Sequence, residues 1–111
     1  MYTYRLKSVK VIDGDTLDVV VDLGFHVSIA LRIRLAGVNC PEKKTEAGHG
    51  AKAFTEDWFK QRDIESLVLT TNKDKTEKYG RYLGTVTGPD GSLNGHLLVM
   101  KHAVPFMVDR T

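Results

Sequence analysis

The sequence predicts a β-rich α+β domain: a five-stranded Greek-key barrel of the OB type with a helix after the third strand and a second, C-terminal helix. The first 36 residues alternate apolar and polar side chains, as strands do. The apolar period then lengthens to that of a helix, and two short β-like runs and a second helical run follow. Short, bulged, largely antiparallel strands in this order favour a partly open OB barrel over a sandwich, with an SH3-like barrel as the alternative.

The first strand contains an irregularity. Tyr2, Tyr4 and Leu6 alternate with polar residues, the phase slips at Ser8, and Val9 resumes the alternation. One extra residue that moves the apolar side chains to the other face predicts a β-bulge.

The next two strands predict a hairpin with one buried face. Residues 16–22 largely alternate apolar side chains with Thr or Asp, Leu23-Gly24 is typical of a turn, and alternate positions from Val27 to Leu35 are apolar. Arg34 has the opposite phase, so we expect its side chain to point away from the buried face and to be free to meet a ligand.

The remaining elements are predicted from period and from turn residues. They are a helix of about four turns over 47–62, a β-like run over 66–71, a polar charged loop over 72–80, a strand over 81–87, a turn over 88–91 and a short helix after Asn94 that ends before Pro105.

Composition limits the class of protein. The 111 residues carry 16 Lys and Arg against 14 Asp and Glu, a net charge of +2, so we expect one folded domain over residues 1–111 with basic groups in local patches. The single cysteine, Cys40, excludes an intramolecular disulfide and a Cys₄ or Cys₂His₂ zinc site. No apolar run is long enough for a membrane span, and no export signal is recognised. We expect a cytoplasmic monomer with no membrane partner, and a secreted mature chain as the alternative.

Three segments contain side chains suited to metal binding or catalysis, and each also has a simpler structural interpretation. Asp13–Thr16 (DGDT) presents two carboxylates around a glycine, which suits Ca²⁺ or Mg²⁺ but also an ordinary hairpin turn. Arg34–Glu42 (RLAGVNCPE) brings an arginine and a glutamate into one short stretch, or is simply a strand exit with a solvated glutamate. Lys78–Arg81 (KYGR) could bind phosphate, or be a basic surface loop. Together these segments supply metal-binding oxygens, a general base and two arginines, which are the parts for phosphodiester hydrolysis.

The motifs VIDGDTL, RLAGVNCPE, EKYGR and LNGHLL resemble, in order and spacing, those of the staphylococcal nuclease (thermonuclease) family, from about Val9 to Met107. The resemblance implies an OB-fold nuclease that binds Ca²⁺ and cleaves single-stranded DNA and RNA, as endonuclease and exonuclease, leaving 3′-phosphate ends. It implies that Glu42 activates water and that Arg34 and Arg81 stabilise the phosphorane. Lys78 and Tyr79 would contact the terminal phosphate of a bound nucleotide.

The metal ligands are also implied by the resemblance. Asp15 would be the principal carboxylate ligand, Asp13 an outer-shell acid, and Cys40 a ligand through its backbone carbonyl. Asn39 stands where the family usually has a second aspartate, so its amide oxygen would coordinate Ca²⁺ without a full charge and the affinity should fall. The alternative function is a catalytically weak or silent OB module that binds single-stranded nucleic acid or a protein partner.

Overall fold

The computed structural model describes residues 2–76 and 81–106, with the backbone alone described for 72–76. The elements, in chain order, are β1 (Tyr2–Asp13), β2 (Thr16–Gly24), β3 (Val27–Leu35), β4 (Val38–Asn39), α1 (Glu46–Lys60), a 3₁₀ turn (Ile64–Ser66), β5 (Val68–Thr76), β6 (Tyr82–Gly88), β7 (Gly91–Ser92), α2 (Leu93–Val99) and β8 (Val104–Pro105). No helix within the described ranges is long and apolar enough to cross a membrane.

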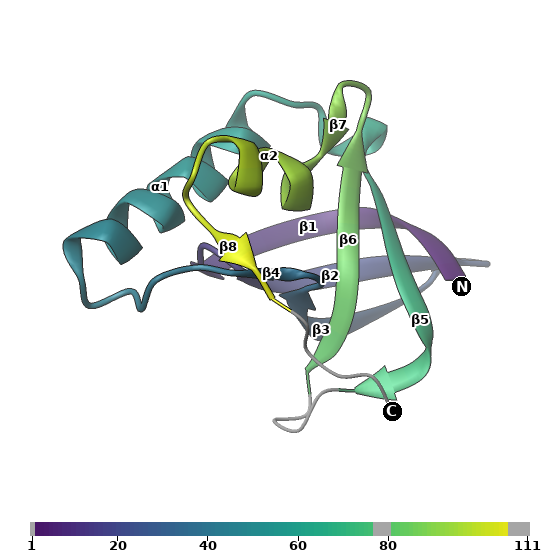
Figure 1. Cartoon of the computed structure of the whole chain (residues 1–111). Helices are drawn as coiled ribbons and strands as arrows, with labels where there is room; N and C mark the ends of the chain where they lie inside the picture. The colour runs from purple at the N-terminus through teal and green to yellow at the C-terminus, as the bar shows by residue number, and fades with distance from the viewer. Residues whose placement is uncertain (1, 77–80, 107–111) are drawn as a thin grey trace.

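The five long strands close into a mixed barrel, which confirms the predicted fold class. Neighbouring strands pair antiparallel in the order β3-β2-β1-β5-β6, and a parallel pairing of β3 with β6 closes the barrel. The two helices lie together at one end of it (Figure 1). Two-residue strands β4 and β8 pair beside the barrel and return the chain after α2 to the end of β3.

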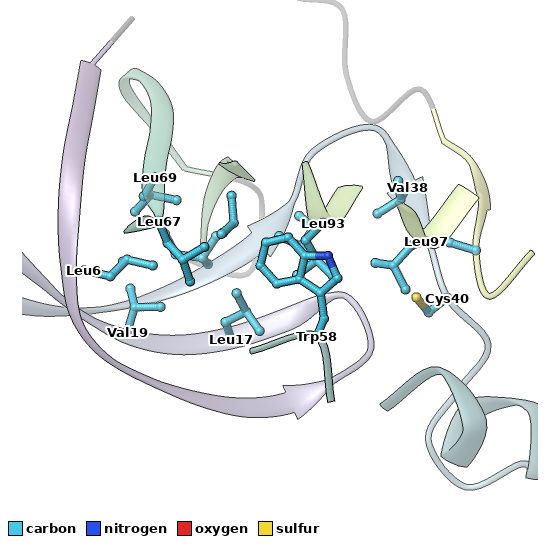
Figure 2. Packing of buried hydrophobic residues seen from close by; sticks show 14 of the residues in the cluster. Leu6, Leu17, Val19, Val38, Cys40, Trp58, Leu67, Leu69, Leu93 and Leu97 are labelled. Carbon is cyan, nitrogen blue, oxygen red and sulfur yellow. The ribbon is translucent and has the colours of Figure 1, made fainter. Parts of the chain in front are cut away.

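The apolar residues of the strands build most of the core, but the predicted buried face of the second hairpin strand is wrong at its start, where Val27 and Ile29 are exposed because they lie at the far tip of the hairpin. Leu17, Val19 and Val21 of β2 are almost completely buried, as the alternation predicts. Trp58 of α1 points into the same cluster, where Figure 2 shows it among leucines from the strands and from α2. Its indole N–H donates to Nδ1 of His96 at 2.7 Å, which joins the two helices.

The predicted bulge is confirmed, since the β1–β2 register shifts between Leu6 and Ser8. The hairpin turn falls later than predicted. β2 continues through Gly24, and the turn is made by Phe25 and His26, whose φ angles of 55° and 63° suit the two-residue connection between right-twisted strands. The predicted loop over 72–80 is wrong for residues 72–76, because these residues extend β5.

Helix boundaries differ from the predictions by one or two residues. The predicted helix over 47–62 is observed as Glu46–Lys60 because Thr45 caps its first turn, and α2 begins at Leu93 because Ser92 caps it. In both caps the side-chain hydroxyl accepts a hydrogen bond from the backbone N–H of a glycine three residues later.

Candidate functional site

The turn between β1 and β2 carries the two candidate metal-binding carboxylates, and α1 packs directly on it. A Cβ added at Gly14 would lie 2.8 Å from Cβ of Ala51 and 2.9 Å from Sγ of Cys40, so only glycine fits without displacement of its neighbours. The Thr55 hydroxyl of α1 donates to the carbonyl of Gly14 at 2.8 Å. The helix therefore holds the turn in a single position.

Asp15 is buried and its carboxylate is oriented by hydrogen bonds. Oδ2 accepts from the backbone N–H of Cys40 at 2.8 Å, and Oδ1 accepts from the hydroxyl of Thr16 at 3.2 Å. Nη1 of Arg34 lies 3.5 Å from Oδ2. The carboxylate is thus positioned by groups from β2, β3 and the segment after β4.

Asp13 has an unsatisfied oxygen. Its Oδ1 is buried and has no hydrogen-bond partner in the described part of the chain. Burial, and then the negative charge of Asp15, raise the pKa of Asp13 above its ordinary value, although Lys43, Lys52 and Arg81 lower it in part. A buried carboxylate oxygen without a donor, beside a second carboxylate, is a place where a cation would be stabilised.

Arg34 is buried and three of its N–H groups are already paired, so the expectation that the whole side chain is free to meet a ligand is wrong. Only 7% of the residue is exposed. Nη1 donates to the carbonyls of Leu35 at 2.9 Å and Val38 at 2.7 Å, and Nη2 donates to Oδ1 of Asn39 at 3.1 Å. The pleat does turn Arg34 away from the core, but the chain reverses after β3 and lays its own carbonyls against the guanidinium.

Gly37 makes that reversal possible. Its φ of +78° lies in the left-handed region that glycine adopts without strain, and its carbonyl accepts from the backbone N–H of Phe106 at 3.0 Å. The Phe106 ring in turn lies 5.5 Å from the guanidinium carbon of Arg34. Phe106 could not be identified from the sequence, because its contact with Arg34 depends on the pairing of β4 with β8.

Cys40 contributes through its backbone. Its N–H orients Asp15, while burial and then the charge of Asp15 raise the pKa of its thiol to about 12. A thiol with this pKa is almost entirely protonated at neutral pH, so it does not suit nucleophilic catalysis. A metal contact through the carbonyl of Cys40 stays a prediction.

Glu42 lies on the exposed segment between Cys40 and α1. Its backbone carbonyl accepts from the N–H of Thr45 at 3.0 Å and from the Thr45 hydroxyl at 2.7 Å. Among the side chains that the structure describes, those of residues 2–71 and 81–106, no hydrogen bond or ion pair of its carboxylate is found. Within that part of the chain, the hydrogen bonds of Glu42 are made by its backbone.

The structure brings Asp13, Asp15, Arg34, Asn39 and Cys40 together around the β1–β2 turn. Arg81 precedes β6, is partly buried and acts electrostatically on Asp13. The predicted phosphate-contacting residues Lys78 and Tyr79 lie outside the described residues. No group of three or more His, Cys, Asp or Glu side chains that could hold a metal ion occurs in the described ranges, so any site here needs neutral oxygens as well.

The chain is similar to several bacterial proteins, some of which are named as nucleases. It matches a family described as staphylococcal nuclease homologue over residues 32–108. It is 40% identical to protein ParB of Escherichia coli over 82 residues, which are 74% of this chain and 41% of that protein. It is 35% identical over 83 residues to an uncharacterized endonuclease of Escherichia coli O157:H7, covering 75% of this chain and 48% of the relative. It is 31% identical to a micrococcal nuclease of Shigella flexneri over 86 residues, which are 78% of this chain and 44% of that protein. The chain spans less than half the length of these relatives.

Proposed function

Because the chain belongs to the staphylococcal nuclease family, we propose that it is a Ca²⁺-dependent phosphodiesterase that cleaves single-stranded DNA and RNA and leaves 3′-phosphate ends. The observation that carries the proposal is the pair of carboxylates at the β1–β2 turn. Asp13 has a buried oxygen without a partner in the described part of the chain, and Asp15 is held in place beside it. Arg34 offsets the charge of Asp15, so the oxygen of Asp13 that lacks a partner is the one that a bound cation would stabilise.

The available oxygens suit Ca²⁺, which prefers carboxylate, amide and backbone carbonyl ligands. Asp15 would be the principal ligand, supported by Asn39, the Cys40 carbonyl and, in the outer shell, Asp13. The bound cation would supply positive charge to the phosphate oxygens of the substrate.

Arg34 and Arg81 would hold the scissile phosphate. Nη1 of Arg34 serves two backbone carbonyls and Nη2 serves Asn39, so within the described residues the Nε hydrogen and one Nη2 hydrogen have no acceptor. Two such donors on one planar guanidinium can bind two phosphate oxygens. Lys78 and Tyr79 would contact the terminal phosphate.

Glu42 would act as the general base. Its exposed carboxylate would accept a proton from the attacking water, whose oxygen bonds to phosphorus. The bond from phosphorus to the 5′ oxygen breaks, and this oxygen leaves with the bonding electron pair and takes up a proton from solvent. The phosphate stays on the 3′ side. The arginines stabilise the negative charge that develops on the five-coordinate phosphorus.

The test compares the wild-type protein with Glu42→Gln on labelled single-stranded DNA and RNA, with Ca²⁺ or with a chelator. We expect Ca²⁺-dependent cleavage that falls by about 10²–10⁴ in the variant, and product ends that polymerase extends only after phosphatase treatment. Glu56→Gln, on the exposed face of α1, is the matched control and should cleave at the wild-type rate. Equal rates for wild type and Glu42→Gln would remove Glu42 from the mechanism.

The same assay tests the alternative of a silent binding module. Tight binding of single strands with no cleavage at millimolar Ca²⁺ would favour that reading. The presence of Asn39 instead of an aspartate in the proposed metal-binding segment motivates the comparison.

A further inference from the structure

We propose that Thr45 is a positioning residue for Glu42, and that α1 sets the distance between Glu42 and the acidic β1–β2 turn. The inference rests on the proposed function, in which Glu42 is the general base. Glu42 lies on an exposed segment, so its carboxylate needs a contact that keeps it in one place.

The Thr45 hydroxyl makes two hydrogen bonds in opposite directions. It donates to the carbonyl of Glu42 at 2.7 Å and accepts from the backbone N–H of Gly48 at 2.9 Å. The backbone N–H of Thr45 donates to the same Glu42 carbonyl at 3.0 Å. One side chain therefore caps α1 and also ties Glu42 to the first turn of that helix.

Gly48 brings the helix into contact with the Glu42 peptide. A Cβ at Gly48 would lie 1.7 Å from the Glu42 carbonyl oxygen and 2.4 Å from its carbonyl carbon. These are backbone atoms that cannot move aside as a flexible side chain would. The helix therefore rests directly on the peptide of Glu42.

The same face of α1 also holds the acidic turn. Gly48, Ala51 and Thr55 follow one another at spacings of three and four residues, so they share a face, and all three are buried. Ala51 packs against Gly14, and Thr55 donates to the Gly14 carbonyl. Gly48 and Thr55 are about 10 Å apart along the axis of a rigid helix. Glu42 and the Asp13–Asp15 turn are thus attached to one spacer.

Thr45 could instead matter only as a helix cap, and three substitutions separate the two roles. Thr45→Ser keeps both hydrogen bonds. Thr45→Val removes both. Thr45→Asp keeps a good capping acceptor for the Gly48 N–H, but a carboxylate cannot donate to the Glu42 carbonyl.

The experiment measures kcat, KM and urea unfolding for the full chain with Ca²⁺ and a single-stranded DNA substrate. We expect Thr45→Ser to behave as wild type, and Thr45→Val and Thr45→Asp to lose about 10- to 100-fold in kcat with little change in KM, because small misplacements of a reacting group are costly. Thr45→Asp should keep most of the wild-type stability. In a Glu42→Gln background neither substitution should lower the residual rate further.

Ser92 provides the matched control. It caps α2 with the same geometry, accepting from the Gly95 N–H at 2.9 Å, and no hydrogen bond joins its described side chain to Glu42. Ser92→Ala should lower the urea midpoint and leave kcat unchanged.

Two results would overturn the inference and leave the proposed function intact. One is a wild-type kcat in Thr45→Asp. The other is that Thr45→Val lowers kcat by the same factor in the wild-type protein and in the Glu42→Gln variant. Failure of the proposed function has a different signature, since Glu42→Gln alone would then cleave at the wild-type rate.

Discussion

The guanidinium of Arg34 and the carboxylate of Asp15 face each other inside the protein, with Nη1 3.5 Å from Oδ2 and about nine-tenths of each side chain buried. Arg34 comes from β3 and Asp15 from the turn before β2, and the Cys40 N–H donates to the same carboxylate oxygen. The arginine therefore has two tasks. It neutralises a buried acid within the fold, and it presents its remaining donors to the proposed phosphate.

Replacing Arg34 should therefore affect both stability and activity. Arg34→Met keeps much of the volume but leaves the Asp15 carboxylate without its cation and the carbonyls of Leu35 and Val38 without a donor. We expect a loss of about 3–5 kcal/mol in the free energy of unfolding and of about 10²- to 10³-fold in kcat. Urea unfolding and the cleavage assay measure the two effects.

Arg32 offers a control two residues earlier on the same strand. Its ion pair with Asp18 is short, at 2.6 Å, but half of the Arg32 side chain is exposed. Arg32→Met should barely change the urea midpoint, because solvent screens an exposed pair. If Arg32→Met and Arg34→Met lowered the free energy of unfolding by similar amounts, the buried Arg34 pair would not stabilise the fold more than the exposed Arg32 pair, and this prediction would be wrong.

Asn39→Asp should strengthen Ca²⁺ binding. The amide oxygen of Asn39 accepts from Nη2 of Arg34, so this side chain is already held beside the carboxylates. An aspartate here would add a full negative charge to the proposed ligand set. We expect the Ca²⁺ concentration for half-maximal cleavage to fall by about one order of magnitude. An unchanged Ca²⁺ requirement would mean that Asn39 is not a ligand.

Asp13→Asn should stabilise the metal-free protein. Burial and the charge of Asp15 raise the pKa of Asp13, so the folded state holds this proton more tightly than the unfolded state does. The free energy of unfolding therefore falls as pH rises from the ordinary aspartate pKa through the raised one. At neutral pH with a chelator present, the variant should unfold at higher urea than wild type.

Calcium should narrow the difference between the two proteins, because the ion offsets the charge that Asp13 contributes. Added Ca²⁺ is expected to raise the urea midpoint of wild type more than that of Asp13→Asn. A variant that is less stable than wild type at neutral pH without Ca²⁺ would contradict this account of Asp13.

Cys40→Ala should leave catalysis intact. The thiol is buried with a pKa of about 12, and the contact with Asp15 is made by the backbone N–H, which alanine keeps. We expect kcat within about threefold of wild type, far from the 10²–10⁴ that loss of a catalytic group costs. A thiol reagent should modify wild-type Cys40 slowly in the native state and quickly in urea. If the reagent modified Cys40 rapidly in the native protein and abolished activity, the conclusion that this thiol takes no part in catalysis would be wrong.

Local patterns were sufficient to predict the barrel and its order of elements. The alternation in the first three strands, the slip at Ser8 and the helical period around Trp58 each depend on which face of an element is buried, and that is written in the order of apolar residues. The family resemblance is likewise confirmed by the match over residues 32–108, which includes the motifs RLAGVNCPE, EKYGR and LNGHLL. Boundaries were less accurate. The turn at Phe25 and His26 uses two residues that are uncommon at positive φ, and the charged strand 72–76 has no apolar alternation to reveal it.

The candidate site could be predicted in residue type but not in environment. Asp13, Asp15, Arg34, Asn39 and Cys40 were all identified as candidates from the sequence. Their burial was not predicted, and the role of Arg34 as the partner of two backbone carbonyls follows only from the reversal at Gly37. Thr45 and Gly48 were also missed, although a threonine before a helical period is a recognisable cap signal.

The sequence by itself determined which chemical groups are present and which face of each strand and helix is apolar, because both depend on residue identity and short-range order. The tertiary structure decided which of those groups meet. Closing β3 against β6, laying β4 beside β8 and resting α1 on Gly14 bring together atoms far apart in the chain, such as the Asp15 carboxylate and the Cys40 N–H. Long-range packing also sets the burial of each acid and base, and burial governs their charges and the donors left to a substrate.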